Sequence, residues 1–460
     1  MKRHDVALFA ITCILLVGCA LRTSPGDVNA AKEEAIKAEQ PEIPADRMEG
    51  SGDIIIGWID TFEDQTLVNL VNEAQAHNKD LAAAAANVTR ARALYTQANA
   101  SLLPSVALNA GGARSGTEGT AGSNLDLGVQ VNWEADVWGR VGAGARSAQA
   151  SAAAAEADLR FARYSLAGGV AKAYFSVIDA GQKLAIAKET VDILSEVLRI
   201  VELREKNGMA SRQDLALARS DLASAKEGLT TVEGGRRDAV RSLELFLGRY
   251  PAAELELGKT LPALPPPPPP GIPAQILERR PDLIAAERRV ASAFEATAQA
   301  KAARLPSLSL TGSTSGASSA LSSLLDPANV AWRVGASLLA PIFDGGSRRA
   351  NVEIATAAQE QALASYGAAA LQAFSEVESS LDQGVVLARR RADLETALTE
   401  AEEAYRIADL RYREGESDLL DALTIQQRVI GAKNNLATLD RLQLEQRVDL
   451  HLALGGDWER

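Results

Sequence analysis

The stretch from Gly139 to Leu247 decides the fold. Apolar and small residues recur in it at two interleaved heptad positions: Leu159, Leu166, Ala173, Ala180, Ala187, Leu194 and Val201, and then Val170, Val177, Leu184, Val191 and Leu198. A seam that holds over about six heptads is typical of a helix packed alongside other helices. At ~1.5 Å per residue, a continuous helix from Gly139 to Lys206 would be roughly 100 Å long, which is more than a globular core can cover.

This predicted helix ends at a turn. Asn207-Gly208 supplies the left-handed backbone conformation that closes many helices, and the apolar pattern resumes at Ser211 in the return direction. The same design recurs from Gly346 to Leu454, with its turn at Glu414-Gly415. We therefore expect two long helical hairpins, although a plain dimeric coiled coil would show the same seam.

Composition argues against several classes of function. Of the 460 residues, 47% are hydrophobic but only 4% are aromatic, which suits closely packed helices better than an aromatic-lined enzyme pocket. The formal net charge of -12 offers no basic surface to nucleic acid. Both cysteines fall in the first twenty residues, and His4, His77 and His451 are too scattered for a metal site or a catalytic triad. We expect no cofactor, no bound metal and no enzymatic activity.

The N-terminus reads as a targeting segment. Two basic residues precede an apolar run, Val6 to Val17, that is too short to span a bilayer. The sequence Leu16-Val17-Gly18-Cys19 resembles the lipobox of bacterial lipoproteins. That resemblance implies cleavage before Cys19, acylation of this cysteine and, with an alanine next in the chain, sorting to the outer membrane. We expect a signal peptide over 1–18 and a lipidated tether over 19–59.

Strand patterns precede the first hairpin. From Leu125 to Trp133 every second residue is apolar, which predicts a strand with one apolar and one polar face. Val106 and Leu108 begin a partner strand, and the Gly/Ser/Thr-rich run Gly111 to Ser123 is expected to be the loop between the two. The segment ahead of them, Asp60 to Leu103, has helical spacing.

The whole unit occurs twice. Leu103-Pro104-Ser105 returns as Leu305-Pro306-Ser307, 202 residues later, and Gly208 returns as Gly415, 207 residues later. The second strand pair begins at Leu308 and ends in an alternating run from Trp332, again with a Ser/Gly-rich loop between. We expect a first repeat over 60–260, a proline-rich linker over 261–273, a second repeat over 274–455 and a tail over 456–460.

The number of strands predicts an oligomer. Four amphipathic strands of about ten residues match the length that crosses an outer membrane at a tilt, although a half-buried sheet in a soluble domain alternates in the same way. Four strands cannot close a barrel, and even about eight enclose only side chains. An open pore would therefore need several copies of the chain to share one barrel.

A set of motifs, in order along the chain, carries a family resemblance. They are Trp133-Glu134-Ala135-Asp136-Val137-Trp138-Gly139-Arg140, Arg280-Pro281-Asp282-Leu283, Arg304-Leu305-Pro306-Ser307-Leu308-Ser309-Leu310-Thr311, Pro341-Ile342-Phe343-Asp344-Gly345-Gly346, Arg411-Tyr412-Arg413-Glu414-Gly415 and Ala453-Leu454-Gly455-Gly456-Asp457-Trp458. With them the chain resembles the TolC-like outer-membrane efflux proteins, in the lipidated branch that works with RND-type pumps. The resemblance implies an α+β membrane fold, internally duplicated. In it, a homotrimeric outer-membrane β-barrel takes four strands from each chain and continues into a long periplasmic α-helical barrel.

The resemblance also assigns roles to the hairpin turns, which in the family form the periplasmic aperture and meet a periplasmic adaptor (membrane fusion) protein. The adaptor-contact residues that it implies are Gly208, Met209, Ala210, Ser211, Gly415, Glu416 and Ser417. The aperture residues that it implies are Asp214, Asp418, Leu420, Asp421 and Thr424. Family members often carry an aspartate where Thr424 stands, and Asp418 and Asp421 are candidates to replace it. Asp418 is equally a candidate N-cap of the returning helix.

The expected function is that of an exit duct in a tripartite efflux system. A homotrimer set in outer-membrane lipid would passively conduct small molecules such as drugs, received from an inner-membrane RND-type pump and the adaptor, to the exterior. The alternative is a periplasm-spanning structural or adhesive coiled-coil lipoprotein without a pore, and conductance in lipid bilayers separates the two.

Overall fold

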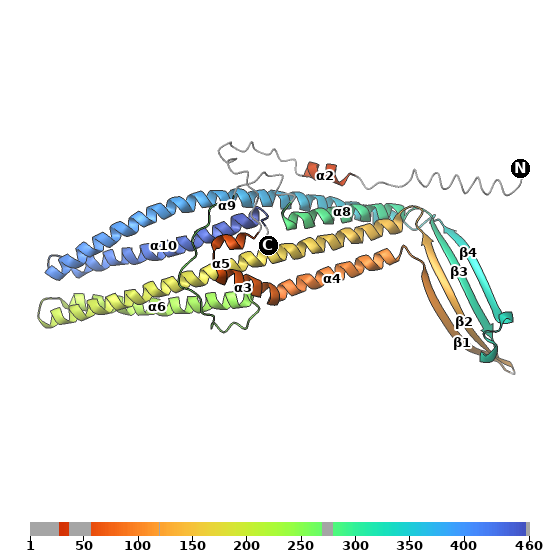
Figure 1. Ribbon diagram of the computed structural model, residues 1–460, viewed down its shortest axis with the longest axis horizontal. Coiled ribbons are helices and arrows are strands. Elements are labelled where there is room, and N and C mark those ends of the chain that lie inside the picture. The colour runs from red at the N-terminus through yellow and green to blue at the C-terminus, as the bar shows by residue number, and fades with distance from the viewer. Residues whose placement is uncertain (1–26, 36–56, 119, 269–278, 457–460) are drawn as a thin grey trace. The chain divides into compact units, whose positions relative to one another are not determined.

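The structure is a computed structural model that describes residues 27–35, 57–118, 120–268 and 279–456 (Figure 1). The expected signal peptide and the expected acylation site Cys19 lie outside these residues, as does part of the expected tether. The elements are α2 (Val28–Ala35), η2 (Trp58–Phe62), α3 (Gln65–His77), α4 (Lys79–Ala100), β1 (Ser105–Thr117), β2 (Thr120–Ala135), α5 (Arg140–Lys206), α6 (Arg212–Phe246), α8 (Pro281–Ala302), β3 (Ser307–Ser318), η3 (Leu321–Ser323), η4 (Pro327–Asn329), β4 (Val330–Leu339), α9 (Ser347–Glu414) and α10 (Leu419–Ala453).

The chain divides into two compact units, and each unit draws on both sequence repeats. The first unit takes in 1–40, 85–158 and 282–370, and therefore holds the sheet. The second unit takes in 41–84, 159–281 and 371–460, and therefore holds both hairpin turns. The duplicated segments thus pair with each other inside each unit instead of folding as one unit per repeat.

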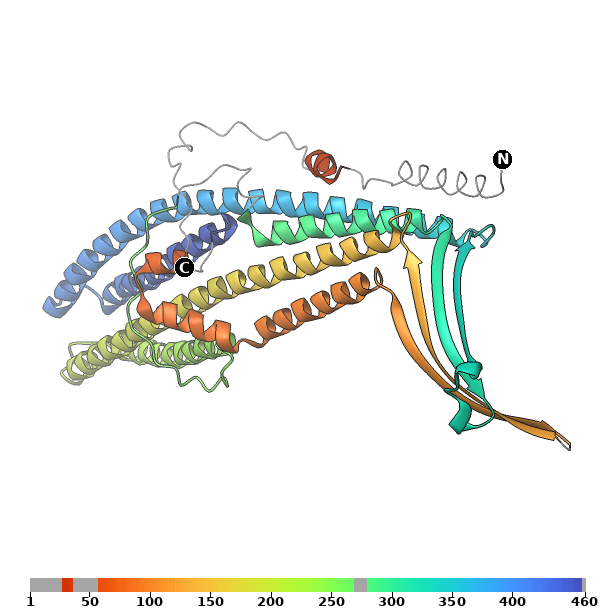
Figure 2. The same ribbon diagram turned by 45° about the vertical axis from the view of Figure 1, so that its right-hand side comes forward.

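The sheet of the first unit is antiparallel, with the order β1-β2-β3-β4. β1 and β4 are its edge strands (Figure 2). In β1–β2, Ser105 pairs with Asn132, and in β3–β4, Ser307 pairs with Leu339. The second pair is the first one shifted by 202 residues on the first strand and by 207 on the second, so the two repeats form hairpins of matching register.

The loops expected within these hairpins were placed wrongly. Gly111 to Ser123 is mostly strand, because β1 continues to Thr117 and β2 begins at Thr120, with Thr117 paired to Thr120. The Ser/Gly-rich run after Leu310 likewise belongs to β3. Glycine and serine favour loops when each residue is judged alone, but here Gly111–Thr117 pairs with Thr120–Asp126 in one continuous ladder, and the hydrogen bonds between the two strands favour strand over loop.

The alternation of apolar and polar residues along the strands is confirmed. Leu127 and Val129 share one face of β2, while Asp126 and Gln130 share the other. Apolar side chains on this sheet are open to solvent in the single chain: Trp332 is 80% exposed and Leu108 is 71% exposed. A face of this kind needs lipid or another protein against it.

The helical segment expected from Asp60 to Leu103 is broken into η2, α3 and α4. The break between α3 and α4 falls at Asn78, whose backbone is extended (φ -63°, ψ 131°). Its side-chain amide donates to the Phe246 carbonyl (3.0 Å) and its side-chain oxygen accepts from the Leu81 N–H (3.0 Å). The kink is therefore held by a contact with a residue far away in the chain, which helical spacing alone does not reveal.

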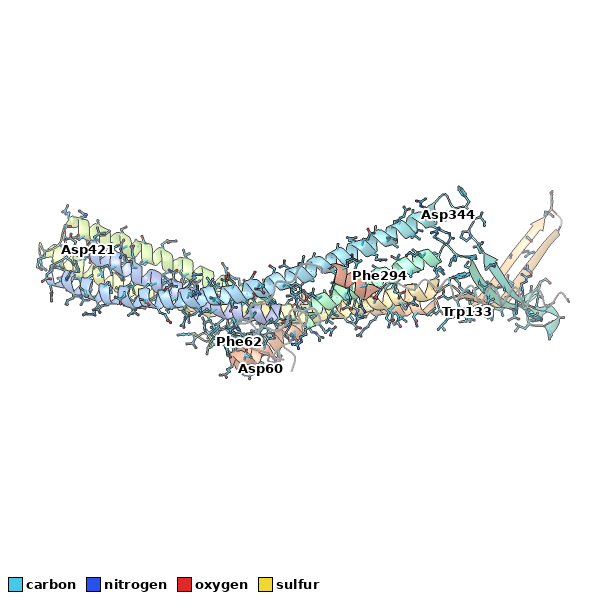
Figure 3. All side chains as sticks on the ribbon, turned by 90° about the horizontal axis from the view of Figure 1, so that it is seen from above. Asp60, Phe62, Trp133, Phe294, Asp344 and Asp421 are labelled. Carbon is cyan, nitrogen blue, oxygen red and sulfur yellow. The ribbon has the colours of Figure 1, made fainter. Side chains whose placement is uncertain are left out.

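The two long hairpins are confirmed (Figure 1). α5 has 67 residues and α9 has 68, and each is followed by a return helix of 35 residues. Within the first unit, each long helix begins at a turn that an aspartate stabilises. Asp136 accepts from the N–H groups of Val141 (2.9 Å) and Gly142 (2.7 Å). Asp344, labelled in Figure 3, accepts from those of Gly346 and Arg348 (3.1 Å each).

An aromatic cluster forms the core of the second unit. Trp58 is fully buried and stacks on His451, with ring centroids 5.5 Å apart, and Phe62 packs on Phe175 at the same centroid distance. Burial and, to a smaller extent, the nearby positive charge of Arg447 lower the pKa of His451 to about 4. This histidine is therefore a neutral packing residue at ordinary pH. None of the described helices combines the length and the apolar character that crossing a bilayer requires.

Candidate functional site: the two hairpin turns

The first turn connects α5 to α6. Gly208 has φ +74°, a conformation that residues with a Cβ rarely adopt. Around it, the Gly208 N–H donates to the Glu205 carbonyl (2.9 Å) and the Met209 N–H to the Arg204 carbonyl (2.8 Å), which closes the helix end. The Met209 side chain is 64% exposed, so the turn presents an apolar group to its surroundings.

A capping box begins α6. Ser211 is the N-cap: its hydroxyl accepts from the Asp214 N–H (3.0 Å), and its own N–H donates to the Asp214 carboxylate (2.9 Å). Two otherwise unpaired N–H groups of the helix start are satisfied in this reciprocal way. The carboxylate of Asp214, for which the family resemblance implies a place at the aperture, stabilises the turn.

The second turn connects α9 to α10. Gly415 has φ +83°, and the Glu416 N–H donates to the Arg411 carbonyl (2.8 Å), as in the first turn. Asp418 stands at the N-cap of α10, in the extended conformation usual there, but its side chain makes no capping hydrogen bond. The expected capping position is correct, whereas the expected capping contact is absent.

The remaining aperture candidates lie at the start of α10, with Asp418 as its N-cap and the other three on its first two turns. Asp418, Leu420, Asp421 and Thr424 are all exposed, and Leu420 is 56% exposed despite being apolar. The Thr424 hydroxyl donates to the Leu420 carbonyl (2.7 Å), so it is turned back onto its own helix. Figure 3 shows Asp421 at the turn end of the α9–α10 hairpin.

The opposite face of the same helix is firmly anchored. Leu419 (2% exposed) and Leu423 (4% exposed) pack into a cluster with Val201 and Leu194 of α5 and with Leu222 of α6. Because the apolar face is fixed against the first hairpin, the acidic face of α10 is held pointing away from this packing.

An arginine joins the two turns. The Arg204 guanidinium, on α5, donates to the Tyr412 carbonyl on α9 (2.9 Å) and lies 4.9 Å from the centroid of the Tyr412 ring. The hydrogen bond and the cation–π contact together hold the ends of the two hairpins side by side. Burial raises the pKa of Tyr412, an effect that the arginine partly opposes.

Sequence reasoning did not find this contact. Tyr412 lies in one of the family motifs, and Arg204 stands three residues before the Asn207-Gly208 turn, but nothing in the sequence links them, since they are 208 residues apart. The only signal was that each precedes a turn glycine. In the described part of the chain, no group of three His, Cys, Asp or Glu side chains gathers as metal ligands.

Comparison with known proteins identifies the family to which this arrangement of strands and hairpins belongs. A family profile described as "Outer membrane efflux protein" matches residues 70–249 and 272–456. The chain is 32% identical over 474 aligned positions to the pyoverdine export outer membrane protein OpmQ of Pseudomonas aeruginosa, covering 100% of this chain and 98% of that protein. It is 29% identical over 417 positions to the cation efflux system protein CusC of Escherichia coli, covering 88% of this chain and 89% of that protein. A solved structure of the outer-membrane channel OprN matches with a TM-score of 0.84 at 28% identity, covering 91% of this chain and 97% of that one.

A four-stranded sheet with two open edges, together with two long hairpins closed by glycine turns, defines a subunit of a TolC-like trimeric channel. The chain belongs to the outer membrane efflux protein family. The family recognition, the fold class and the outer-membrane location expected from the sequence are thereby confirmed. The family is one of channel and transport proteins and not of enzymes.

Proposed function

We propose that this chain is the exit duct of a tripartite efflux system, in which three copies form a passive conduit for small molecules such as drugs. An inner-membrane RND-type pump and a periplasmic adaptor would deliver the cargo to it. The observation that carries the proposal is the state of the second turn. Within the described residues, the carboxylates of Asp418 and Asp421 are exposed and have neither a hydrogen bond nor an ion pair.

Three copies of this turn around one axis would bring six such carboxylates together. Like charges in a narrow opening repel one another, attract cations and resist tight closure. Leu420 and Thr424, on the same exposed stretch, would line the opening with them. Asp214 would contribute less to the local field, because its carboxylate is already bound to a backbone N–H.

The turns themselves suit docking to an adaptor. Gly208 and Gly415 leave the backbone accessible, and the exposed Met209 offers a flexible apolar contact that tolerates different partner surfaces. Ala210, Ser211, Glu416 and Ser417 complete the proposed contact surface. Small and flexible groups of this kind fit a partner helix tip that must approach the backbone closely.

Two measurements test the proposal. Purified trimers in lipid bilayers should conduct ions, and deletion of the protein from its host should increase drug sensitivity, with full recovery on re-expression. Trimers without conductance would instead favour the structural lipoprotein without a pore.

The cargo of this chain needs its own test, because OpmQ is named for pyoverdine export and CusC for cation efflux. We assign small molecules such as drugs to it. Growth of the deletion strain on a panel of drugs, a siderophore and metal cations would check this. Sensitivity confined to the cations would contradict the assignment.

Lipidation at Cys19 and the division into repeats are part of the same proposal. Mass spectrometry of the mature N-terminus should find an acylated Cys19, and Cys19→Ser should remove the acyl group. The linker over 261–273 should tolerate cleavage without dissociation of the two repeats, because each compact unit contains segments of both.

A further inference from the structure

The two edges of the sheet are open in the single chain. β1 and β4 each pair on one side only, and their apolar side chains are exposed: Val106 by 68% and Val334 by 77%. An open, apolar edge strand is a ready template for another strand. The occupant that the proposed trimer supplies is a second copy of this chain, with β4 of one subunit against β1 of the next.

The duplication gives the register of this pairing. Moving the pair Ser105–Asn132 by 202 residues on the first strand and 207 on the second yields Ser307–Leu339, which is the pair observed in the second hairpin. The two repeats are therefore equivalent within the sheet. The β2–β3 pairing, which joins the repeats inside one chain, is then the template for the pairing that joins two chains.

We propose that β4 and β1 of the partner subunit pair in the register obtained by carrying the β2–β3 pairs over with the same offsets. The pair Gly128–Ser315 becomes Gly335 with Ala113 of the partner subunit, and Asp126–Ala317 becomes Arg333 with Ser115 of the partner subunit. This inference rests on the proposed trimeric channel and specifies how its barrel closes.

Side-chain sizes agree with this register. Trp332 meets Gly116 of the partner subunit, Ala336 meets Gly112 of the partner subunit and Leu338 meets Ala110 of the partner subunit. These three apolar residues of β4 thus each face a glycine or an alanine, and Val334 faces the aliphatic part of Arg114 of the partner subunit. A slip by one residue would turn the apolar face of one strand against the polar face of the other.

The register has an electrostatic consequence. The same offset of 207 makes Asp126 and Arg333 equivalent positions, both on the polar face of the sheet and both exposed. Among the described residues neither side chain has an ion-pair partner. Three copies would therefore set three carboxylates and three guanidiniums alternately around the lumen at one height. Neighbouring charges would be two strands, or about 10 Å, apart across the sheet and would also be staggered by four residues along the strands, because Asp126 pairs with Ala317 and Arg333 pairs with Ser313.

The charged side chains of Asp126 and Arg333 both have small residues as cross-strand neighbours on the polar face. A Cβ at Gly111 would lie 2.5 Å from the Asp126 carboxylate oxygen, so the carboxylate lies over this glycine, its cross-strand partner. Arg333 has Ser313 of β3 as its cross-strand partner within the chain, and Ser115 of the partner subunit would be its partner on the other side. The ring of three carboxylates and three guanidiniums is neutral as a whole, so the barrel would admit cargo of either sign.

Cysteine cross-linking tests the register. Gly335→Cys combined with Ala113→Cys should form disulfide-linked subunits on mild oxidation, because directly opposed strand residues bring their Cβ atoms within disulfide reach. The matched controls combine Gly335→Cys with Ser115→Cys or with Asn109→Cys, which lie two and four residues away on the same face. Faster linking in either control would overturn the register.

Reversal potentials, measured in a salt gradient at low ionic strength, test the proposed ring of Asp126 and Arg333 side chains. Asp126→Asn should shift the channel towards anions, Arg333→Gln should shift it towards cations, and the double variant should return close to the original value. Arg114→Gln, on the opposite face, should change nothing. Conducting trimers whose selectivity ignores both residues would overturn the ring alone, whereas absence of trimers or of conductance would overturn the proposed function.

Discussion

The two hairpin turns are copies of one design that differ in their acidic residues. Both close with a glycine at positive φ, Gly208 and Gly415. At the start of the return helix, the first turn has Ser211 and Asp214, and the second has Asp418 and Asp421 at the equivalent positions, 207 residues later. The serine and aspartate bind each other's backbone N–H groups, whereas the two aspartates do not form this box.

The difference has a simple physical reason. A capping box needs one short acceptor side chain at the N-cap and a second one that reaches back to it. Two ionised carboxylates in those places repel each other, so the box does not form and both remain free. Because the two copies have diverged, the first turn is stabilised by its own cap, whereas the second turn has two carboxylates without a capping bond.

The largest effect is expected from the feature that the turns share. Gly208→Val and Gly415→Val each force a β-branched residue into a left-handed conformation, at a cost of about 1–2 kcal/mol or more. We expect the turn to deform and drug resistance to fall to that of the deletion strain, while trimers persist in the outer membrane. Gly→Asn at the same positions tolerates this conformation and should retain activity. Full resistance in the valine variants would argue against docking at the turns.

A smaller effect is expected from separating the turns. Arg204→Ala removes the hydrogen bond and the cation–π contact with Tyr412, together about 1–2 kcal/mol. Single-channel conductance should rise, and amide exchange at 412–416 should become faster. Arg199→Ala is the matched control, because Arg199 pairs with Glu196 within the same helix. Equal conductance and exchange in the two variants would show that the link does not restrain the aperture.

Exchanging the N-cap residues of the two turns should change the free energy of unfolding by about 1 kcal/mol, with a gain for the second turn and a loss for the first. Asp418→Ser should complete a capping box with Asp421, slow amide exchange at the start of α10 and reduce selectivity for cations. Ser211→Asp should break the existing box, speed up exchange at the start of α6 and increase that selectivity. If both variants shift selectivity the same way, the carboxylates of the second turn do not act on permeating ions.

The smallest effect is expected at Thr424. Thr424→Asp adds a carboxylate next to two that are already free, so the preference for cations should rise slightly, with little change in stability because the position is exposed. Thr424→Ser keeps the hydroxyl bond to the Leu420 carbonyl and serves as the control. Reversal potentials compare the two, and a preference for anions in the aspartate variant would contradict an inward-facing position.

Several features of this protein follow from the sequence by itself. Heptad periodicity predicted α5 and α9, alternation predicted the strands, the glycine turns predicted where the helices reverse, and the duplication predicted a repeated unit. All of these depend on residues within a few positions of one another, or on direct comparison of two stretches, so the sequence contains them in full.

Contacts between distant residues were decided only by the tertiary structure. It extended the strands through Gly111–Ser123, bent the chain at Asn78 against Phe246, and joined Arg204 to Tyr412. It also distributed each repeat over two compact units. Local periodicity carries no information on which distant backbone or side chain satisfies a hydrogen bond, and that choice is made only when the chain packs.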